Sequence, residues 1–161
     1  MAAPYATPAF AVIPPLMTDE SFVNGVWAHI LGTYFLFPDF VIEPEKYTPR
    51  KNRADLYVHK IQGGRAMLCY EGKVKGGQDA TFGLARAQAG VYMDETRARF
   101  GMVGIGREVV FITPQGSDLW DLKIDRSGKP VPVKGHNPLD ILNDSAAIHT
   151  ILTAIRNQPL T

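Results

Sequence analysis

The sequence predicts a mixed α/β domain in which helices flank a central sheet. Three observations support this prediction. Apolar residues recur at helical spacing before residue 38, and two β-rich runs meet at a Gly-Gly pair at positions 63 and 64. Residues 79–100 then have the composition of a helix, and more strand-like runs follow. The expected order of elements is therefore α-β-β-β-α-β-β-α.

Length and composition are those of one globular domain. The chain has 161 residues, of which 45% are hydrophobic and 20% charged, and a net charge of +1. A near-neutral total gives no electrostatic sign of a nucleic-acid partner. Cys69 is the one cysteine, so an internal disulfide is excluded, and we expect it to be a small core residue.

Residues 1–17 form a segment of their own. They are apolar, contain four prolines and have no basic residue before the apolar run, which fits neither a signal peptide nor a membrane-spanning helix. We expect an N-terminal arm that packs over the body or docks on a partner, followed by one domain over residues 18–161. The expected location is intracellular, in the cytoplasm or nucleus, with no membrane association.

The first helix is expected to start at a cap, either Thr18 or Asp19, and to end before Pro38. Its apolar stripe consists of Phe22, Val23, Val26, Trp27, Ile30, Leu31 and Tyr34. A strand over residues 40–48 follows, and Pro44 within it suits an edge or a bulge. Residues 54–62 and 66–74 are then predicted to form a hairpin, because both glycines of the turn tolerate positive φ.

The second helix is expected over about residues 79–100, with Gly101 at its end. Two more strands are predicted over residues 102–113 and 119–125. A proline-rich connection leads to a last helix over about residues 143–157.

The predicted hairpin brings together residues that can carry chemistry. Alternation places Asp55 on one face of its strand, with Tyr57 and His59, and places Glu71 and Lys73 together on the next strand. Two carboxylates supply the hard oxygen ligands that Mg²⁺ or Mn²⁺ prefers, and a bound ion lowers the pKa of its water. An ammonium two residues beyond the second carboxylate can orient that water or neutralise developing charge.

These residues resemble the motif of the PD-(D/E)xK, or restriction-endonuclease-like, nucleases: Asp55 begins one strand and Glu71-Gly-Lys73 lies in the next. The resemblance implies an α-β-β-β-α-β core with a mixed central sheet flanked by helices, plus an extra C-terminal strand and helix. It also implies Mg²⁺- or Mn²⁺-dependent hydrolysis of DNA or RNA, with Asp55 and Glu71 as metal ligands and Lys73 orienting the water. Ala54 stands where the family often has proline.

Further residues extend the resemblance. Gln88 and Tyr92 match the Q-x-x-x-Y motif of one branch of the superfamily, and i and i+4 residues share a helical face. The branch implies a catalytic or supporting role for Gln88, with Tyr92 beside it. Glu20 is the candidate for the carboxylate that many members supply from the first helix, with His29 as the alternative. The runs at 101–114 and 119–124 are also similar to nuclease-like domains of fungal genomes.

Other interpretations remain open at this point. A catalytically inactive copy of the fold could act as an interaction module or effector, with a protein partner or as a homodimer. An α/β domain unrelated to nucleases that binds an apolar ligand or partner is a third hypothesis. For the motif itself, the alternative is that Glu71 and Lys73 lie solvated on an exposed strand. The basic residues between positions 46 and 53 contact phosphate or form a solvated loop; they are Lys46, Arg50, Lys51 and Arg53.

Overall fold

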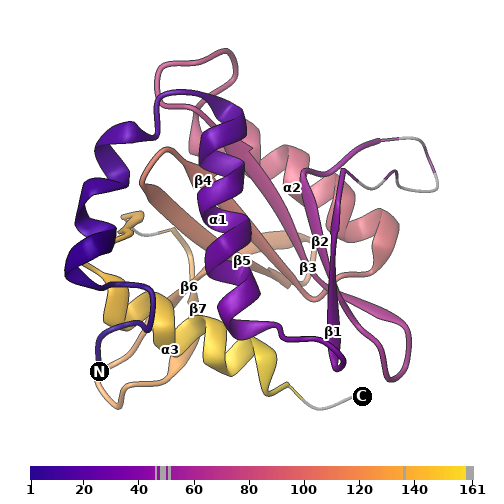
Figure 1. Ribbon diagram of the computed structural model, residues 1–161. Helices are drawn as coiled ribbons and strands as arrows, with labels where there is room; N and C mark the ends of the chain where they lie inside the picture. The colour runs from indigo at the N-terminus through magenta and orange to yellow at the C-terminus, as the bar shows by residue number, and fades with distance from the viewer. Residues whose placement is uncertain (46, 48–49, 51, 136, 159–161) are drawn as a thin grey trace.

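A computed structural model describes residues 1–45, 47, 50, 52–135 and 137–158. Within these residues, eight strands form one sheet with spatial order β1-β2-β3-β4-β5-β6-β7, and β8 pairs with β5 (Figure 1). The strands are β1 (Phe40–Pro44), β2 (Leu56–Lys60), β3 (Arg65–Lys73), β4 (Phe100–Ile105), β5 (Glu108–Gln115), β6 (Asp118–Ile124), β7 (Pro130–Val133) and β8 (Leu139–Asp140).

Helices cover both faces of the sheet. On one face lie α1 (Glu20–Tyr34) and α3 (Ser145–Arg156), and on the other lies α2 (Phe82–Thr96) (Figure 1). The sheet separates two apolar clusters, the larger under α1 and α3 and the smaller under α2. The strand pair β3–β4 is parallel because α2 carries the chain back across the sheet, whereas the other neighbours pair antiparallel. The predicted fold class is confirmed.

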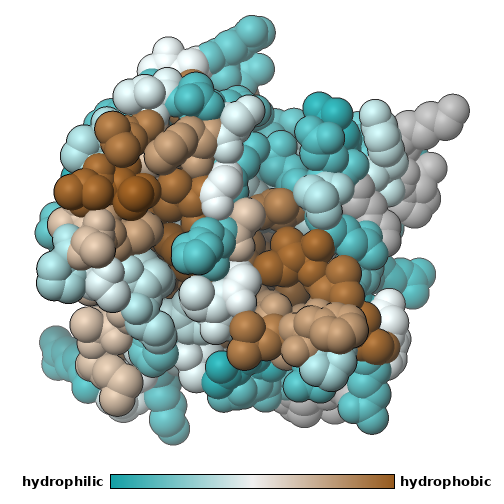
Figure 2. Space-filling view, in the orientation of Figure 1, coloured by the Kyte–Doolittle hydropathy of each residue, from teal (hydrophilic) through white to brown (hydrophobic). Residues whose placement is uncertain are grey.

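The first 17 residues contain two short 3-10 turns, η1 (Pro8–Val12) and η2 (Pro14–Leu16). Ala3, Tyr5 and Met17 are buried in the larger core, and the Tyr5 hydroxyl donates to the carbonyl of Ile141 at 3.0 Å. The segment also has an apolar outer surface, seen at the upper left of Figure 2. It therefore packs against the sheet-and-helix body and still presents apolar side chains to solvent.

Helix α1 begins as the sequence indicates. Of the two candidate caps, Asp19 fills the role, accepting a hydrogen bond from the backbone N–H of Phe22 at 2.8 Å. Most of its predicted apolar stripe is buried, and the indole N–H of Trp27 donates to the carbonyl of Gly106 at 3.1 Å. This bond ties the middle of α1 to the β4–β5 turn, so the helix has a fixed position over the sheet.

The predicted hairpin is confirmed. Strands β2 and β3 pair antiparallel from Leu56↔Tyr70 to Lys60↔Arg65, with a bulge between Val58 and His59. The turn uses Gly63 and Gly64 at φ 88° and 59°, values that L side chains rarely adopt.

Three predicted boundaries are wrong. The second helix spans Phe82–Thr96 and not residues 79–100, and Gly101 lies inside β4 instead of ending the helix. Gly101 is needed there for close packing, since a Cβ would lie 2.6 Å from the Met93 sulfur. The run predicted as one strand at 102–113 is two, β4 and β5, because Gly106 turns the chain with φ 56°.

The remaining differences concern short strands. The first strand ends at Pro44, and position 48, where it was expected to end, lies outside the described residues. Strands β7 and β8 were not predicted. The proline-rich stretch that contains β7 was interpreted as a connection that leads to the last helix. Among the described residues, no helix combines the length and the apolar character needed to cross a bilayer.

Candidate functional site

The candidate site lies at the carboxyl end of β3, between the first turns of α1 and the inner face of α2. Alternation along β3 turns Cys69, Glu71 and Lys73 toward α2, while Tyr70 and Gly72 face α1. Glu71 is almost fully buried, with 2% of its surface exposed, and its Oε1 lies 2.8 Å from the Lys73 ammonium nitrogen. The Glu-x-Lys spacing thus produces one ion pair on one face of the strand.

Asp55 joins this pair from the neighbouring strand. It directly precedes β2 and is half-buried, and its Oδ2 accepts the backbone N–H of Gly72 at 2.8 Å. The backbone pairing of β2 with β3 stops at Leu56↔Tyr70. The Asp55 carboxylate therefore links the two strands beyond their last backbone pair. Asp55 and the Glu-x-Lys segment lie next to each other, as the sequence predicts.

Burial dominates the electrostatics of Glu71. Desolvation raises the pKa of its carboxyl to about 7, the hydrogen bond from Lys73 works in the opposite direction, and the charge of Asp55 raises it further. The second oxygen, Oε2, is buried and has no hydrogen-bond partner among the described residues. A buried carboxylate oxygen without a donor is costly, and its cost is removed when a cation binds it.

The other two charges of the site respond to the same environment. Burial raises the pKa of Asp55, and the Gly72 N–H opposes that shift by stabilising the charged form. Burial acts against the charge of Lys73, but its hydrogen bond and attraction to Glu71 outweigh burial, so the pKa of the ammonium is raised. Lys73 therefore stays protonated at neutral pH.

Gln88 and Tyr92 face the site from α2. The Gln88 amide Nε2 donates to the Tyr92 hydroxyl at 2.7 Å, and Tyr92 is buried. Burial raises the pKa of this phenol, and the charges of Glu71 and Asp55 raise it further, which places the ring within electrostatic reach of both carboxylates. The i, i+4 pair thus lies on the inner side of its helix, with Tyr92 buried and Gln88 half-buried.

The two candidates on α1 differ. Glu20 is exposed at the start of the helix, and its charge contributes to the raised pKa values of Asp55, Glu71 and Lys73, so it lies near the site. His29 is exposed nine residues further on, which is half a turn away around the helix. None of the contacts among the described residues connects His29 with Asp55 or Glu71.

Sequence reasoning did not identify two residues of the site, Asn24 and Tyr70. Asn24 lies one turn after Glu20, and its side-chain amide lowers the pKa of the nearby Asp55 carboxyl. Its Oδ1 also accepts the hydroxyl of the fully buried Tyr70 at 3.1 Å. The available signal was a polar residue at the border of the α1 stripe, four positions after the candidate Glu20 and hence on the same side of the helix.

The donor set fits a hard divalent cation. Asp55 and Glu71 offer carboxylate oxygens, and Glu71 Oε2 is unpartnered among the described residues. No group of three or more His, Cys, Asp and Glu side chains within those residues is arranged to hold a metal ion. Protein ligation would therefore be limited to two carboxylates, with water or phosphate oxygens completing the shell, as is usual for Mg²⁺.

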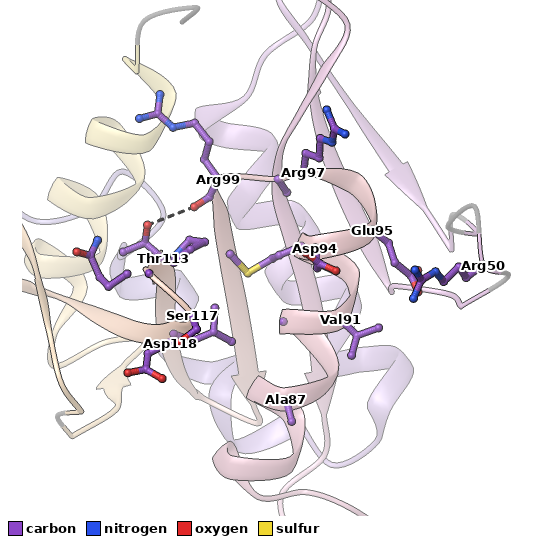
Figure 3. A pocket seen from close by; sticks show the side chains of 17 residues that line it. Arg50, Ala87, Val91, Asp94, Glu95, Arg97, Arg99, Thr113, Ser117 and Asp118 are labelled. Carbon is purple, nitrogen blue, oxygen red and sulfur yellow. Dashed lines mark hydrogen bonds between the residues drawn. The ribbon is translucent and has the colours of Figure 1, made fainter.

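A pocket lies elsewhere on the molecule. A cavity of about 950 Å³ lies between the second half of α2, the α2–β4 connection and the β5–β6 turn (Figure 3), and its lining includes neither Asp55 nor Glu71. Arg97 and Arg99 lie at its upper rim in Figure 3, with Asp94 and Asp118 also part of the lining. Opposite charges balance around this pocket, so it is not a basic track for a phosphate backbone.

The predicted basic cluster is described only in part. Arg50 lines the same pocket, and Arg53 forms an ion pair with Glu45 at 3.8 Å. Lys46 and Lys51 lie outside the described residues. His59, on the predicted face of Asp55, lies 3.6 Å from Glu43 and belongs to the β1–β2 pair rather than to the site.

Comparison with known proteins gives a structural likeness without a sequence family. No family model matches the chain, and no curated protein matches it. DrdV in its complex with DNA superposes with a TM-score of 0.53 and 14% identity over 88% of this chain. The type IIG restriction endonuclease BpuSI gives a TM-score of 0.49 and 14% identity, covering 98% of this chain and 18% of its own.

The comparison rests on the DrdV structure, and the chain spans only about 12% of that DrdV chain. At such identity the likeness concerns the fold. In this chain the fold has the element order α1-β1-β2-β3-α2-β4, with an antiparallel β1–β2–β3 meander and a parallel β3–β4 pair. The chain shares its fold with part of the DrdV chain: a mixed α/β domain with a central, mostly antiparallel sheet flanked by helices.

Proposed function

We propose that residues 18–161 form a single metal-dependent nuclease domain that hydrolyses phosphodiester bonds of DNA or RNA, with residues 1–17 as its packed N-terminal arm. One observation carries the proposal. The buried Glu71 keeps one carboxylate oxygen without a partner among the described residues, beside Asp55 and Lys73, at the end of β3 in a nuclease fold. A nuclease of cellular DNA or RNA would act in the cytoplasm or the nucleus.

Asp55 and Glu71 would hold Mg²⁺ or Mn²⁺, which supplies an acidified water and stabilises charge on the scissile phosphate. Glu71 is suited to this task because its Oε1 is already paired with Lys73 while none of the described residues engages Oε2. Lys73 remains charged in the site, so its ammonium can orient the attacking water and offset the negative charge that develops. Removal of Lys73 would therefore affect the rate more than the binding of the ion.

The α2 side of the site supports the assignment to the Q-x-x-x-Y branch. The Gln88 amide is held by the Tyr92 hydroxyl, which leaves its carbonyl oxygen as an acceptor for the site or for a nucleotide. Tyr92 packs below it as part of the apolar cluster under α2. Glu20 is placed to act through its charge at the same site, whereas His29 is no longer a candidate ligand in this proposal.

A catalytically inactive interaction module is the second candidate. Two observations favour it: the described residues bring no third carboxylate into a metal-binding group, and Val12 and Leu16 expose apolar side chains on the arm (Figure 2). In this case Lys73 permanently replaces the cation as the partner of Glu71. Binding of divalent metal separates the two candidates, because the active site requires it.

The test combines calorimetric titration with Mn²⁺ and a cleavage assay on DNA and RNA. We expect Asp55→Ala and Glu71→Ala to remove both metal binding and cleavage. Lys73→Ala should retain metal binding and lose most cleavage, since an ammonium acts through the transition state. Asp118→Ala, at an exposed position in the β5–β6 hairpin, is the matched control and should behave as the wild type. Failure of the wild type to bind Mn²⁺ at millimolar concentration would favour the inactive module.

A further inference from the structure

Asn24 connects the core with the candidate site. It lies half-buried on the sheet-facing side of α1, and its Oδ1 accepts the hydroxyl of Tyr70. Tyr70 is fully buried, so this hydroxyl must have a partner. Since Oδ1 accepts from Tyr70, the Nδ2–H group is the part of the amide that remains to interact with Asp55, and the amide lowers the pKa of that nearby carboxyl. The amide orientation is thereby fixed by the core.

The neighbouring glycine shows how closely Asn24 approaches the strand. A Cβ at Gly72 would lie 1.8 Å from Asn24 Oδ1 and 2.4 Å from the Tyr70 hydroxyl oxygen. The Gly72 N–H in turn donates to Asp55 Oδ2. The middle residue of the Glu-x-Lys motif is therefore glycine for a steric reason: the Asn24 amide occupies the space that a side chain would need.

These contacts leave Asp55 little freedom. The backbone of β3 supplies one donor, and the Asn24 amide lies near the carboxylate on a helix that Trp27, three residues later, anchors to the β4–β5 turn. A carboxylate restrained from two elements has fewer orientations to lose when it binds an ion. Both restraints exist before any ion arrives.

We propose that Asn24 is a positioning residue for Asp55, and that the chain from the Tyr70 hydroxyl through the Asn24 amide to the Asp55 carboxylate orients that carboxylate for cation binding. This inference rests on the proposed function for its role in metal binding. The contrary view is that Asn24 only satisfies the buried Tyr70 hydroxyl. Asn24 would then contribute to stability and leave metal affinity unchanged.

The first arm of the test is NMR of the metal-free protein, which records the side-chain amide resonances of Asn24. We expect both Asp55→Ala and Tyr70→Phe to shift these resonances, because each removes one partner of the amide. His29→Ala, an exposed change on the other side of α1, should leave them in place. An Asn24 amide unaffected by Asp55→Ala would overturn the proposal whether or not the protein binds metal.

The second arm is the Mn²⁺ dissociation constant, measured together with the unfolding free energy of each variant. Outer-shell partners of ligands typically change metal affinity by about 10- to 100-fold. We expect Asn24→Ala to weaken Mn²⁺ binding by about tenfold and Tyr70→Phe by less, with His29→Ala unchanged. Lower stability with unchanged affinity would overturn the positioning role. If the wild type binds no Mn²⁺, the proposed function fails, and the NMR arm alone decides whether Asn24 holds Asp55.

Discussion

Replacement of Glu71 by glutamine tests the electrostatics of the site directly. The carboxyl of Glu71 has a pKa of about 7 in the folded protein, against 4.5 for an ordinary glutamate. Between these two values the folded protein retains a proton that the unfolded chain has already released. The metal-free protein must therefore lose stability as pH rises through this window, and the loss is complete above about pH 7.

The size of this loss of stability follows from the size of the pKa shift of Glu71. Each pKa unit corresponds to about 1.4 kcal/mol, so the full window costs about 3 kcal/mol of unfolding free energy. Solvent screening reduces this little, since only 3% of the Glu71 side chain is exposed. Glu71→Gln has nearly the same shape and cannot ionise. Its stability should therefore fall by about 3 kcal/mol less than that of the wild type between pH 4.5 and 8.

Urea denaturation in EDTA, followed by circular dichroism at several pH values across this range, measures the effect. Asp118→Asn serves as the exposed control and should keep the pH dependence of the wild type. Excess Mn²⁺ should flatten the wild-type curve, because a bound cation holds the carboxylate ionised in the folded protein. Parallel curves for Glu71→Gln and the wild type in EDTA would show that Glu71 ionises normally, and the argument from its burial would be refuted.

Two further predictions concern the residues around the site. Gly72→Ala should destabilise the protein by about 1–3 kcal/mol, since its Cβ would overlap Asn24, whereas Gly25→Ala, with open space at its Cβ, should stabilise α1 by up to about 1 kcal/mol in thermal denaturation. Arg86→Met removes the cation paired with the fully buried Asp121 and should cost about 3–5 kcal/mol in urea denaturation. Additional replacement of Asp121 by leucine should recover most of that loss, and a double variant no more stable than Arg86→Met would contradict the role of the ion pair.

The hairpin and the motif on it could be predicted because both depend on local pattern. Gly63 and Gly64 fix the turn, and the turn fixes which residues of β2 and β3 lie together. Asp55 and Glu71 therefore meet as expected, and Gln88 and Tyr92 share the inner face of α2 by helical spacing alone.

The second half of the sheet was harder to predict because its signals are not local. Strand β4 and most of β5 are buried and apolar, and the turn between them is marked in the sequence only by Gly106 and the charged pair Arg107 and Glu108. Helix α2 ends at Arg97 in the left-handed region, a position where glycine is the usual signal. Gly101, the glycine that suggested an end, is instead required by contacts with Met93 and Ile112.

Asn24 could not have been assigned from the sequence for a related reason. Its role depends on where α1 crosses the sheet, and that position is set by long-range contacts such as the bond from Trp27 to the carbonyl of Gly106. Sequence spacing places Asn24 on the side of Glu20 but does not say which strand that side meets. Only the packed structure connects it with Tyr70 and Asp55.

The free-energy cost of burying the Glu71 carboxylate favours a functional cation site over a domain that has kept the fold and lost the activity. At neutral pH and without metal, this buried carboxyl destabilises the protein, and its Oε2 has no hydrogen-bond partner among the described residues. A glutamine or an apolar side chain of similar size would remove that cost in a purely structural domain. A cation bound between Glu71 and Asp55 removes it as well, because the ion replaces the lost hydration of both carboxylates. The arrangement is therefore unfavourable in a purely structural domain, which supports the proposed metal site.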